Sequence, residues 1–393
     1  MSIVEFPYWP KRVIAGIGTV ERIPNEILKL SGKRVVFFTD SNINALPFTK
    51  KIITSISDAG FVIDVYTEIE ENPSETSVHT AAKYMFEFKP DIVVYFGGGS
   101  VIDLGKAANL IYTHGGIINE YEDLVGGIEK ISDCLLPSIA ITTTAGSGSE
   151  VSSVSVITDT REERKMAILS PYIVPDVSIL DASVTVSMSS ALTAYTGMDA
   201  LTHLIEAYIS DVPFEPGRGI ALQGIKLINN SLRKVVLNGR DILARQDMVV
   251  ASACGAMAFN NNFLGAVHAC AHQLSTLAGI PHGLANSIML VPVMKWNLMS
   301  NVEAFADIAQ VMGFPIHTVS PREAAEKAIS LVSQLAADIE IPKHLSELGV
   351  TQDMIGKLVD KAYQDHNNLS NPRKSSNNDV PKDVIRQFYL EAF

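Results

Sequence analysis

The chain has 393 residues, with 43 acidic and 31 basic side chains and a formal net charge of −12. This length suggests two domains, and a hydrophobic content of 47% argues against extended disorder. Because no cluster of Lys and Arg offsets the negative charge, we expect no nucleic-acid or membrane partner, and no apolar run looks long enough to span a bilayer. The early acid and prolines at the N-terminus are not typical of a signal peptide, and three scattered cysteines indicate a cytoplasmic protein.

In the first half of the chain, predicted strands alternate with predicted helices. Apolar, β-branched and aromatic runs predict strands at 33–40, 61–66, 91–96 and 135–142, and the segments 43–59, 74–88 and 101–113 have helical patterns. Such alternation indicates crossover units and a parallel sheet. Helix-length apolar periodicity follows residue 181 nearly to the end. We therefore expect an α/β domain over residues 1–184 and an all-helical domain over residues 185–393.

Two glycine-rich segments follow predicted strands. Gly97, Gly98, Gly99 and Ser100 end the third strand, and a run of hydroxyls and glycines at 142–150 follows the fourth. Such turns admit a phosphate to backbone N–H groups at a helix N-terminus, although a tight turn alone explains each nearly as well. Neither segment is a G-x-G-x-x-G fingerprint or a P-loop. An acid after the first strand, Asp40, can accept hydrogen bonds from a ribose diol and would repel a 2′-phosphate, which favours NAD over NADP.

Histidines concentrate between residues 203 and 282. Asp199 and His203 stand four residues apart, as do His268 and His272, and His282 is expected in a loop. Positions i and i+4 share one helix face, so each pair can converge on one point, although a single pair of this kind is usually a surface feature. Three imidazoles and one carboxylate suit Fe(II) or Zn(II), and the donor set does not distinguish these ions.

Together these motifs resemble the iron-containing (group III) alcohol dehydrogenase family. The matching stretches are GGGSVIDLGKA (97–107), TTAGSGSEV (143–151), GMDALTHLIEAY (197–208) and GAVHACAHQLSTLAGIPHG (265–283), with Asn371, Pro372 and Arg373 as a further element. The resemblance implies the dehydroquinate synthase-like fold: a Rossmann-like dinucleotide-binding α/β domain, an all-helical domain, and a cleft that holds cofactor and metal. It also implies a homodimer.

Carried over position by position, the resemblance assigns roles to individual residues. The implied metal ligands are Asp199, His203, His268 and His282, with His272 as a catalytic or proton-relay residue. The implied NAD contacts are Asp40, Asn72, Gly98, Gly99, Ser100, Asp103, Thr143, Thr144, Ser147, Ser152 and Lys165. The implied substrate wall comprises Val154, Phe259 and Leu264, to which we add Asn367 from a polar segment at 366–368. With the asparagines at 260–262 this segment suggests a polar substrate, although surface turns would explain them equally well.

The implied activity is hydride transfer between NAD(H) and a small alcohol or aldehyde, polar or anionic, at a divalent metal, with Fe(II) favoured and Zn(II) acceptable. A polyol dehydrogenase or a dehydroquinate synthase-like lyase of related fold is the main alternative. A metal-dependent hydrolase is a further one, with Glu206 as its base.

Overall fold

The computed structural model describes residues 8–212 and 214–393. The chain divides into two compact units. The first comprises residues up to 144 together with 148–187, and the second comprises 145–147 together with 188–393. The expected boundary at residue 184 thus lies three residues before the first unit ends.

The first unit is built on one parallel sheet of six strands. In spatial order these strands are β1 (Val13–Ala15), β8 (Val177–Leu180), β5 (Ser138–Thr142), β4 (Ile92–Gly97), β2 (Arg34–Phe38) and β3 (Val62–Tyr66). The central strands β4 and β5 are buried along their whole length, and the nearly continuous apolar run at 91–96 predicts this for β4. Because neighbouring parallel strands end at the same edge, the segments that follow β4 and β5 meet there.

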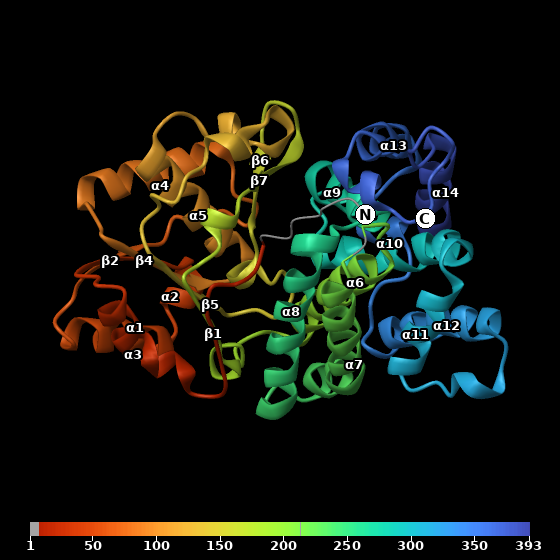
Figure 1. Cartoon of the computed structure of the whole chain (residues 1–393), viewed down its shortest axis with the longest axis horizontal. Helices are drawn as coiled ribbons and strands as arrows, with labels where there is room; N and C mark the ends of the chain where they lie inside the picture. The colour runs from red at the N-terminus through yellow and green to blue at the C-terminus, as the bar shows by residue number, and fades with distance from the viewer. Residues whose placement is uncertain (1–7, 213) are drawn as a thin grey trace. The chain divides into compact units, whose positions relative to one another are not determined.

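Helices cover both faces of this sheet. They are α1 (Ile23–Lys29), α2 (Ser41–Asn44), α3 (Pro47–Asp58), α4 (Glu75–Phe88) and α5 (Gly99–His114). Figure 1 shows α4 and α5 on one side and α1 and α3 on the other. Alternate residues of β2 enter the two cores: Val36 packs with α4 and α5, and Val35 packs with α1 and α3.

Some first-unit elements differ from the sequence expectations. The single helix expected at 43–59 is divided, because Pro47 begins α3 and holds Leu46 in an extended conformation. Strands β1 and β8 were not expected, since three or four residues are too few to show a periodicity. An antiparallel hairpin, β6 (Val154–Asp159) with β7 (Arg164–Leu169), was also not expected.

The described part of the second unit is helical, as the periodicity after residue 181 predicts. Its helices are α6 (Ser190–Ile209), α7 (Glu215–Leu237), α8 (Ile242–Asn262), α9 (Ala266–Ala278), α10 (His282–Asn297), α11 (Val302–Val311), α12 (Pro321–Asp338), α13 (Ile355–Tyr363) and α14 (Lys382–Ala392). Close packing of α6 on α7 depends on glycine, because a Cβ at Gly197 would lie 2.3 Å from Leu232 Cδ1.

Helix α8 alone among the described helices is long and apolar enough, by length and composition, to cross a membrane. This corrects the expectation that the sequence holds no such run. However, 56% of its apolar window is buried inside the protein, which is usual for a core helix.

Candidate functional site

Helix α6 carries the first two candidate ligands. It begins at the N-cap Ser189, whose side chain accepts a hydrogen bond from Leu192 N. Asp199 and His203 follow one turn apart and are both buried. Helix α8 approaches His203 closely, since a Cβ at Gly255 would lie 3.2 Å from its Cβ.

Helices α9 and α10 supply the remaining imidazoles. His268 and His272 share one face of α9, and His282 is the first residue of α10. The expectation that His282 lies in a loop is therefore wrong, because Pro281 acts as the N-cap of a helix that starts directly after it. A Cβ at Gly283 would lie 2.4 Å from Tyr195 O, so glycine is required for α10 to approach α6 this closely.

These helices bring four side chains to one point. One potential ligand atom from each of Asp199, His203, His268 and His282 lies within 4.8 Å of the other three. Burial lowers the pKa of both His203 and His268, and the neighbouring imidazoles lower the pKa of His268 further, so both rings are neutral near pH 7 and keep a lone pair. His203 Nδ1 is buried and has no hydrogen-bond partner. A borderline divalent cation fits this donor set of one carboxylate and three imidazoles.

Asn286 contacts three of these four residues and was not expected from the sequence. Its Nδ2 lies 2.7 Å from Asp199 Oδ1 and 3.1 Å from Nε2 of both His268 and His282. Asn286 follows His282 by four residues on α10, so the same i, i+4 rule that found the histidine pairs could have found it.

Glu206 lies behind His268. Its Oε2 is 2.5 Å from His268 Nδ1, and its Oε1 accepts a hydrogen bond of 2.7 Å from Val267 N. Burial raises the pKa of Glu206 to about 8, while backbone N–H groups at the start of α9 oppose that rise. Both carboxylate oxygens are therefore engaged by α9.

His272 does not belong to the four-residue cluster but lies beside it. Its ring is stacked on that of His282 with 5.5 Å between centroids. Its Nδ1 is 2.9 Å from Oδ2 of Asp365, the residue preceding the short 3-10 helix η12 (His366–Ser370). Burial acts to raise the pKa of Asp365, but His272 and Asn367 lower it below its usual value, so the group is a carboxylate that accepts the Nδ1 proton. No local pattern could have indicated this partner, which is 93 residues away.

In the first unit, the glycine-rich turn and the hydroxyl-rich run meet at the carboxyl edge of the sheet. Gly98 is the N-cap of α5, and the N–H of Thr143 donates to Gly97 O at 3.0 Å. A Cβ at Gly98 would lie 3.3 Å from Thr144 Cγ2, so these two predicted NAD contacts are neighbours. Gly99 begins α5 and Ser100 follows, with its hydroxyl donating to Glu71 O. The N-terminus of α5, with its positive helix dipole, makes this edge suitable for a phosphate.

Asn72 and Lys165 also meet, although they are 93 residues apart. Lys165 Nζ donates to Asn72 Oδ1 at 2.7 Å and to Thr158 Oγ1 at 3.1 Å. Burial lowers the pKa of Lys165 to about 8. Asp40 is the N-cap of α2, where its Oδ1 accepts from two backbone N–H groups.

Two other predicted NAD contacts are engaged within the protein. Asp103 bonds the hydroxyl of Ser149 and the N–H of Val156, and the Ser152 hydroxyl accepts from Val154 N. Below them, Lys106 Nζ donates to the carbonyls of residues 149, 152 and 154 at 2.7, 2.7 and 3.0 Å. These contacts fix the loop after β5. Ser147 is grouped with the second unit.

Family models match both structural units of the chain. The family model described as iron-containing alcohol dehydrogenase matches residues 10–182, and the model for the C-terminal part of the Fe-containing alcohol dehydrogenase family matches residues 193–389. The 1,3-propanediol dehydrogenase of Klebsiella pneumoniae is 40% identical over 362 residues, which cover 92% of each chain. The chain belongs to the iron-containing alcohol dehydrogenase family.

Other relatives of this iron-containing alcohol dehydrogenase agree. The NAD-dependent methanol dehydrogenase of Bacillus methanolicus is 34% identical over 94% of this chain and 96% of its own. The crystal structure of a 1,3-propanediol oxidoreductase superposes with a TM-score of 0.94 at 37% identity, with complete coverage of both chains. Together they confirm the fold class, the NAD-linked alcohol dehydrogenase activity and the use of NAD(H) with an iron-type metal. The hydrolase alternative is wrong, and both oxygens of its expected base, Glu206, are engaged by α9.

The residues expected to form the substrate wall occupy different surroundings in the dehydrogenase. Phe259 packs on His203 with 4.9 Å between ring centroids. Leu264 lies between α8 and α9, and its carbonyl accepts from Ser370. The amide of Asn367 donates to Asp365 at 2.9 Å. Val154 begins β6 in the first unit. The asparagines at 260–262 are buried in the last turn of α8, so they are not surface turns.

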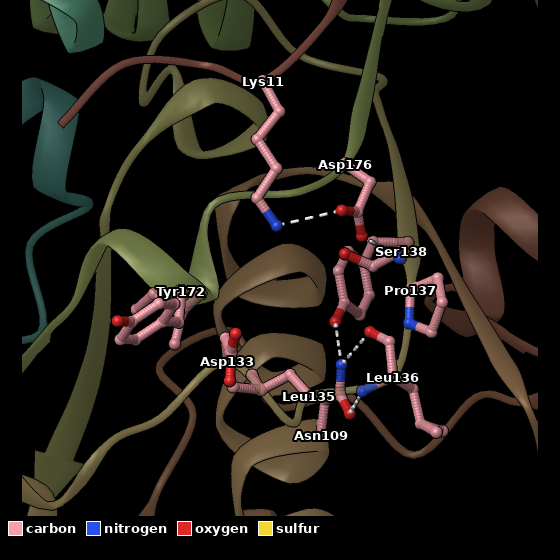
Figure 2. A pocket seen from close by; sticks show the side chains of 11 residues that line it. Lys11, Asn109, Asp133, Leu135, Leu136, Pro137, Ser138, Tyr172 and Asp176 are labelled. Atoms are coloured by element: carbon pink, nitrogen blue, oxygen red, sulfur yellow. Dashed lines mark hydrogen bonds and ion pairs between the residues drawn. The ribbon is translucent and has the colours of Figure 1, made fainter. Parts of the chain in front are cut away.

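A separate cavity of about 230 Å³ lies where β5 begins, at the opposite edge of the sheet (Figure 2). Its polar side chains pair with neighbouring groups. Lys11 bonds Asp176 at 2.9 Å, and Asn109 bonds the carbonyl and the N–H of Leu136. No predicted site residue of the alcohol dehydrogenase lines it.

Proposed function

We propose that Asp199, His203, His268 and His282 hold the divalent ion and that His272 handles the substrate proton. The observation that supports this most strongly is the convergence of four donor atoms within 4.8 Å, at the motif positions of the family. When bound, the ion acts as a Lewis acid on the substrate oxygen and NAD(H) exchanges the hydride.

The protein's own groups provide for the proton. In alcohol oxidation the substrate hydroxyl loses a proton, and a neutral imidazole can accept it. Because Asp365 accepts the Nδ1 proton of His272, the lone pair is on Nε2, which becomes the basic atom. The Asp365 carboxylate then stabilises the imidazolium that forms.

For the cofactor, we propose that the phosphates lie at the N-terminus of α5, on Gly98, Gly99 and Ser100. Residues Thr143, Thr144, Ser147 and Ser152 would line the nicotinamide side. Asp40, Asn72 and Lys165 would contact the adenosine end, where a carboxylate favours NAD over NADP. Asp103 supports this site from below, through the hydroxyl of Ser149.

For the substrate, we propose a short alcohol or its aldehyde, with three-carbon hydroxyaldehydes as the first choice. Relatives named for 1,3-propanediol and methanol support a small substrate. Phe259 on His203 would supply an apolar wall, and Asn367 beside Asp365 a polar one. We further propose a homodimer in the cytoplasm, where three free cysteines remain reduced.

The test is NADH oxidation under anaerobic conditions by Fe(II)-loaded and Zn(II)-loaded protein. The panel contains 3-hydroxypropionaldehyde, lactaldehyde, succinic semialdehyde and sulfoacetaldehyde. We expect turnover with at least one of these aldehydes, and loss of bound metal in His268→Ala. The control His317→Ala changes an exposed histidine outside the cluster and should retain both the metal and the turnover. Metal retention in His268→Ala would contradict the ligand set. Absence of turnover with metal and NADH both bound would contradict the proposed short aldehyde substrates.

A further inference from the structure

Glu206 contacts both the N-terminus of α9 and the ring of His268. It is 3% exposed and lies on α6, three residues after His203. One oxygen accepts from the backbone of α9 at Val267, and the other lies 2.5 Å from His268 Nδ1. On the other side of the same ring, Nε2 lies 3.1 Å from the Asn286 amide, which also contacts Asp199 and His282. Nε2 is therefore the atom directed at the candidate metal site.

We propose that Glu206 is the positioning residue that makes His268 a ligand, by holding the ring proton on Nδ1 and leaving the Nε2 lone pair directed at the site. This inference rests on the proposed ligand set. A neutral imidazole carries one proton, and whichever nitrogen bears it cannot bind a metal. The Asn286 NH₂ group can only donate to Nε2, so the ring proton lies on Nδ1 and Glu206 Oε2 accepts it. The buried contact also fixes the orientation of the ring.

Glu206 also has a structural role as a cap of helix α9. Helix α9 has no cap from its own N-cap residue, Gly265. Glu206 and Asn371 cap it instead, at the N–H of Val267 and of Ala266 respectively. The favourable interaction of a carboxylate with a helix N-terminus is worth about 0.3–1 kcal/mol. Gly265 is required for this arrangement, because its Cβ would lie 2.9 Å from Glu206 Oε1.

The substitution Glu206→Gln separates the two roles. A backbone N–H can only donate, so the amide oxygen of the glutamine should remain on Val267 N. The amide NH₂ then faces His268 Nδ1, which has to accept, and the ring proton moves to Nε2. The cap and the side-chain volume are retained while the ligating lone pair is lost. Substituting such a partner typically lowers metal affinity by about 10–100-fold.

The experiment measures Co(II) and Zn(II) affinity by chelator competition, together with the Co(II) absorption spectrum and the unfolding midpoint of the metal-free protein. Glu206→Gln should bind metal about 10–100-fold more weakly with little change in the metal-free midpoint. Glu206→Asp retains a carboxyl group that can accept the Nδ1 proton and should bind metal more tightly than Glu206→Gln. The matched control is Asn371→Ala, which removes a cap of α9 without touching a ligand, and its metal affinity should stay near that of the wild type.

Wild-type affinity in Glu206→Gln would overturn the proposal, as would an equal loss in Asn371→Ala. If Glu206→Gln does not fold, a ¹⁵N-histidine spectrum of the metal-free wild type decides: the Nδ1–H tautomer at His268 supports the proposal and the Nε2–H tautomer refutes it. The ligand set is judged separately by wild type against His268→Ala. If these two bind metal equally, the proposed site is wrong, whatever Glu206 does.

Discussion

Replacing Asp365 by asparagine changes one acceptor beside His272 and hardly changes the side-chain volume. Asp365 Oδ1 accepts from both the backbone N–H and the side-chain amide of Asn367, at 3.0 and 2.9 Å. Since the backbone N–H can only donate, the asparagine oxygen should stay there. Its NH₂ group then faces His272 Nδ1, which lies 2.9 Å from Oδ2 in the native protein. His272 must accept at Nδ1, so its proton moves to Nε2.

This change of tautomer determines the expected loss in kcat. An imidazole protonated on Nε2 cannot take the substrate proton there. The contribution of a general base is about 10²–10⁴-fold in rate, which corresponds to roughly 3–5 kcal/mol at about 1.4 kcal/mol per factor of ten. The side chain of Asp365 is 13% exposed, so water replaces the lost charge poorly. We therefore expect kcat to fall by about 10²–10⁴-fold.

The assay is steady-state oxidation of the best alcohol from the panel by metal-loaded Asp365→Asn. The KM for NAD and the metal content should remain close to wild type, because Asp365 bonds His272, Gln273 and Asn367 and none of the three histidines and one aspartate of the cluster. A kcat within threefold of the wild type would refute the role of His272 as the base held by Asp365. Loss of metal in parallel with kcat would show instead that Asp365 supports the metal site.

Four further substitutions test the first unit and helix packing. Lys106→Met removes the donor to three buried carbonyls in the loop after β5, and we expect a loss of about 3 kcal/mol or more, measured by urea unfolding, together with weaker NADH binding. Gly105→Ala places a Cβ 2.3 Å from the ring of Tyr95 and should cost about 1–3 kcal/mol, whereas Gly219→Ala, in open space on α7, should stabilise by about 0.4–1 kcal/mol. Burial lowers the pKa of Lys165 to about 8, so its cation is present below pH 8 and lost above it. NADH affinity measured by fluorescence should therefore fall between pH 7 and 9 in the wild type, by about tenfold, and stay flat in Lys165→Met.

The sequence by itself determined the element types and the spacing of the candidate ligands. A nearly continuous apolar run identified β4, because a strand buried on both faces leaves that pattern. The four-residue spacing of Asp199 with His203 placed both on one helix face, since that geometry belongs to the helix alone. Local patterns do not indicate a strand as short as β1, and they place His282 in a loop, whereas it is the first residue of α10.

Only the tertiary structure decided which carboxylates contact the Nδ1 atoms of His268 and His272. Glu206 meets His268 across 62 residues, and Asp365 meets His272 across 93. Sequence periodicity reports interactions within one or two helical turns. Contacts between distant segments depend on how closely the helices pack, which here depends on glycines such as Gly265 and Gly283 that admit a neighbouring side chain or backbone. The candidate ligands could therefore be found from local spacing, whereas the carboxylates beside His268 and His272 could be found only in the folded protein.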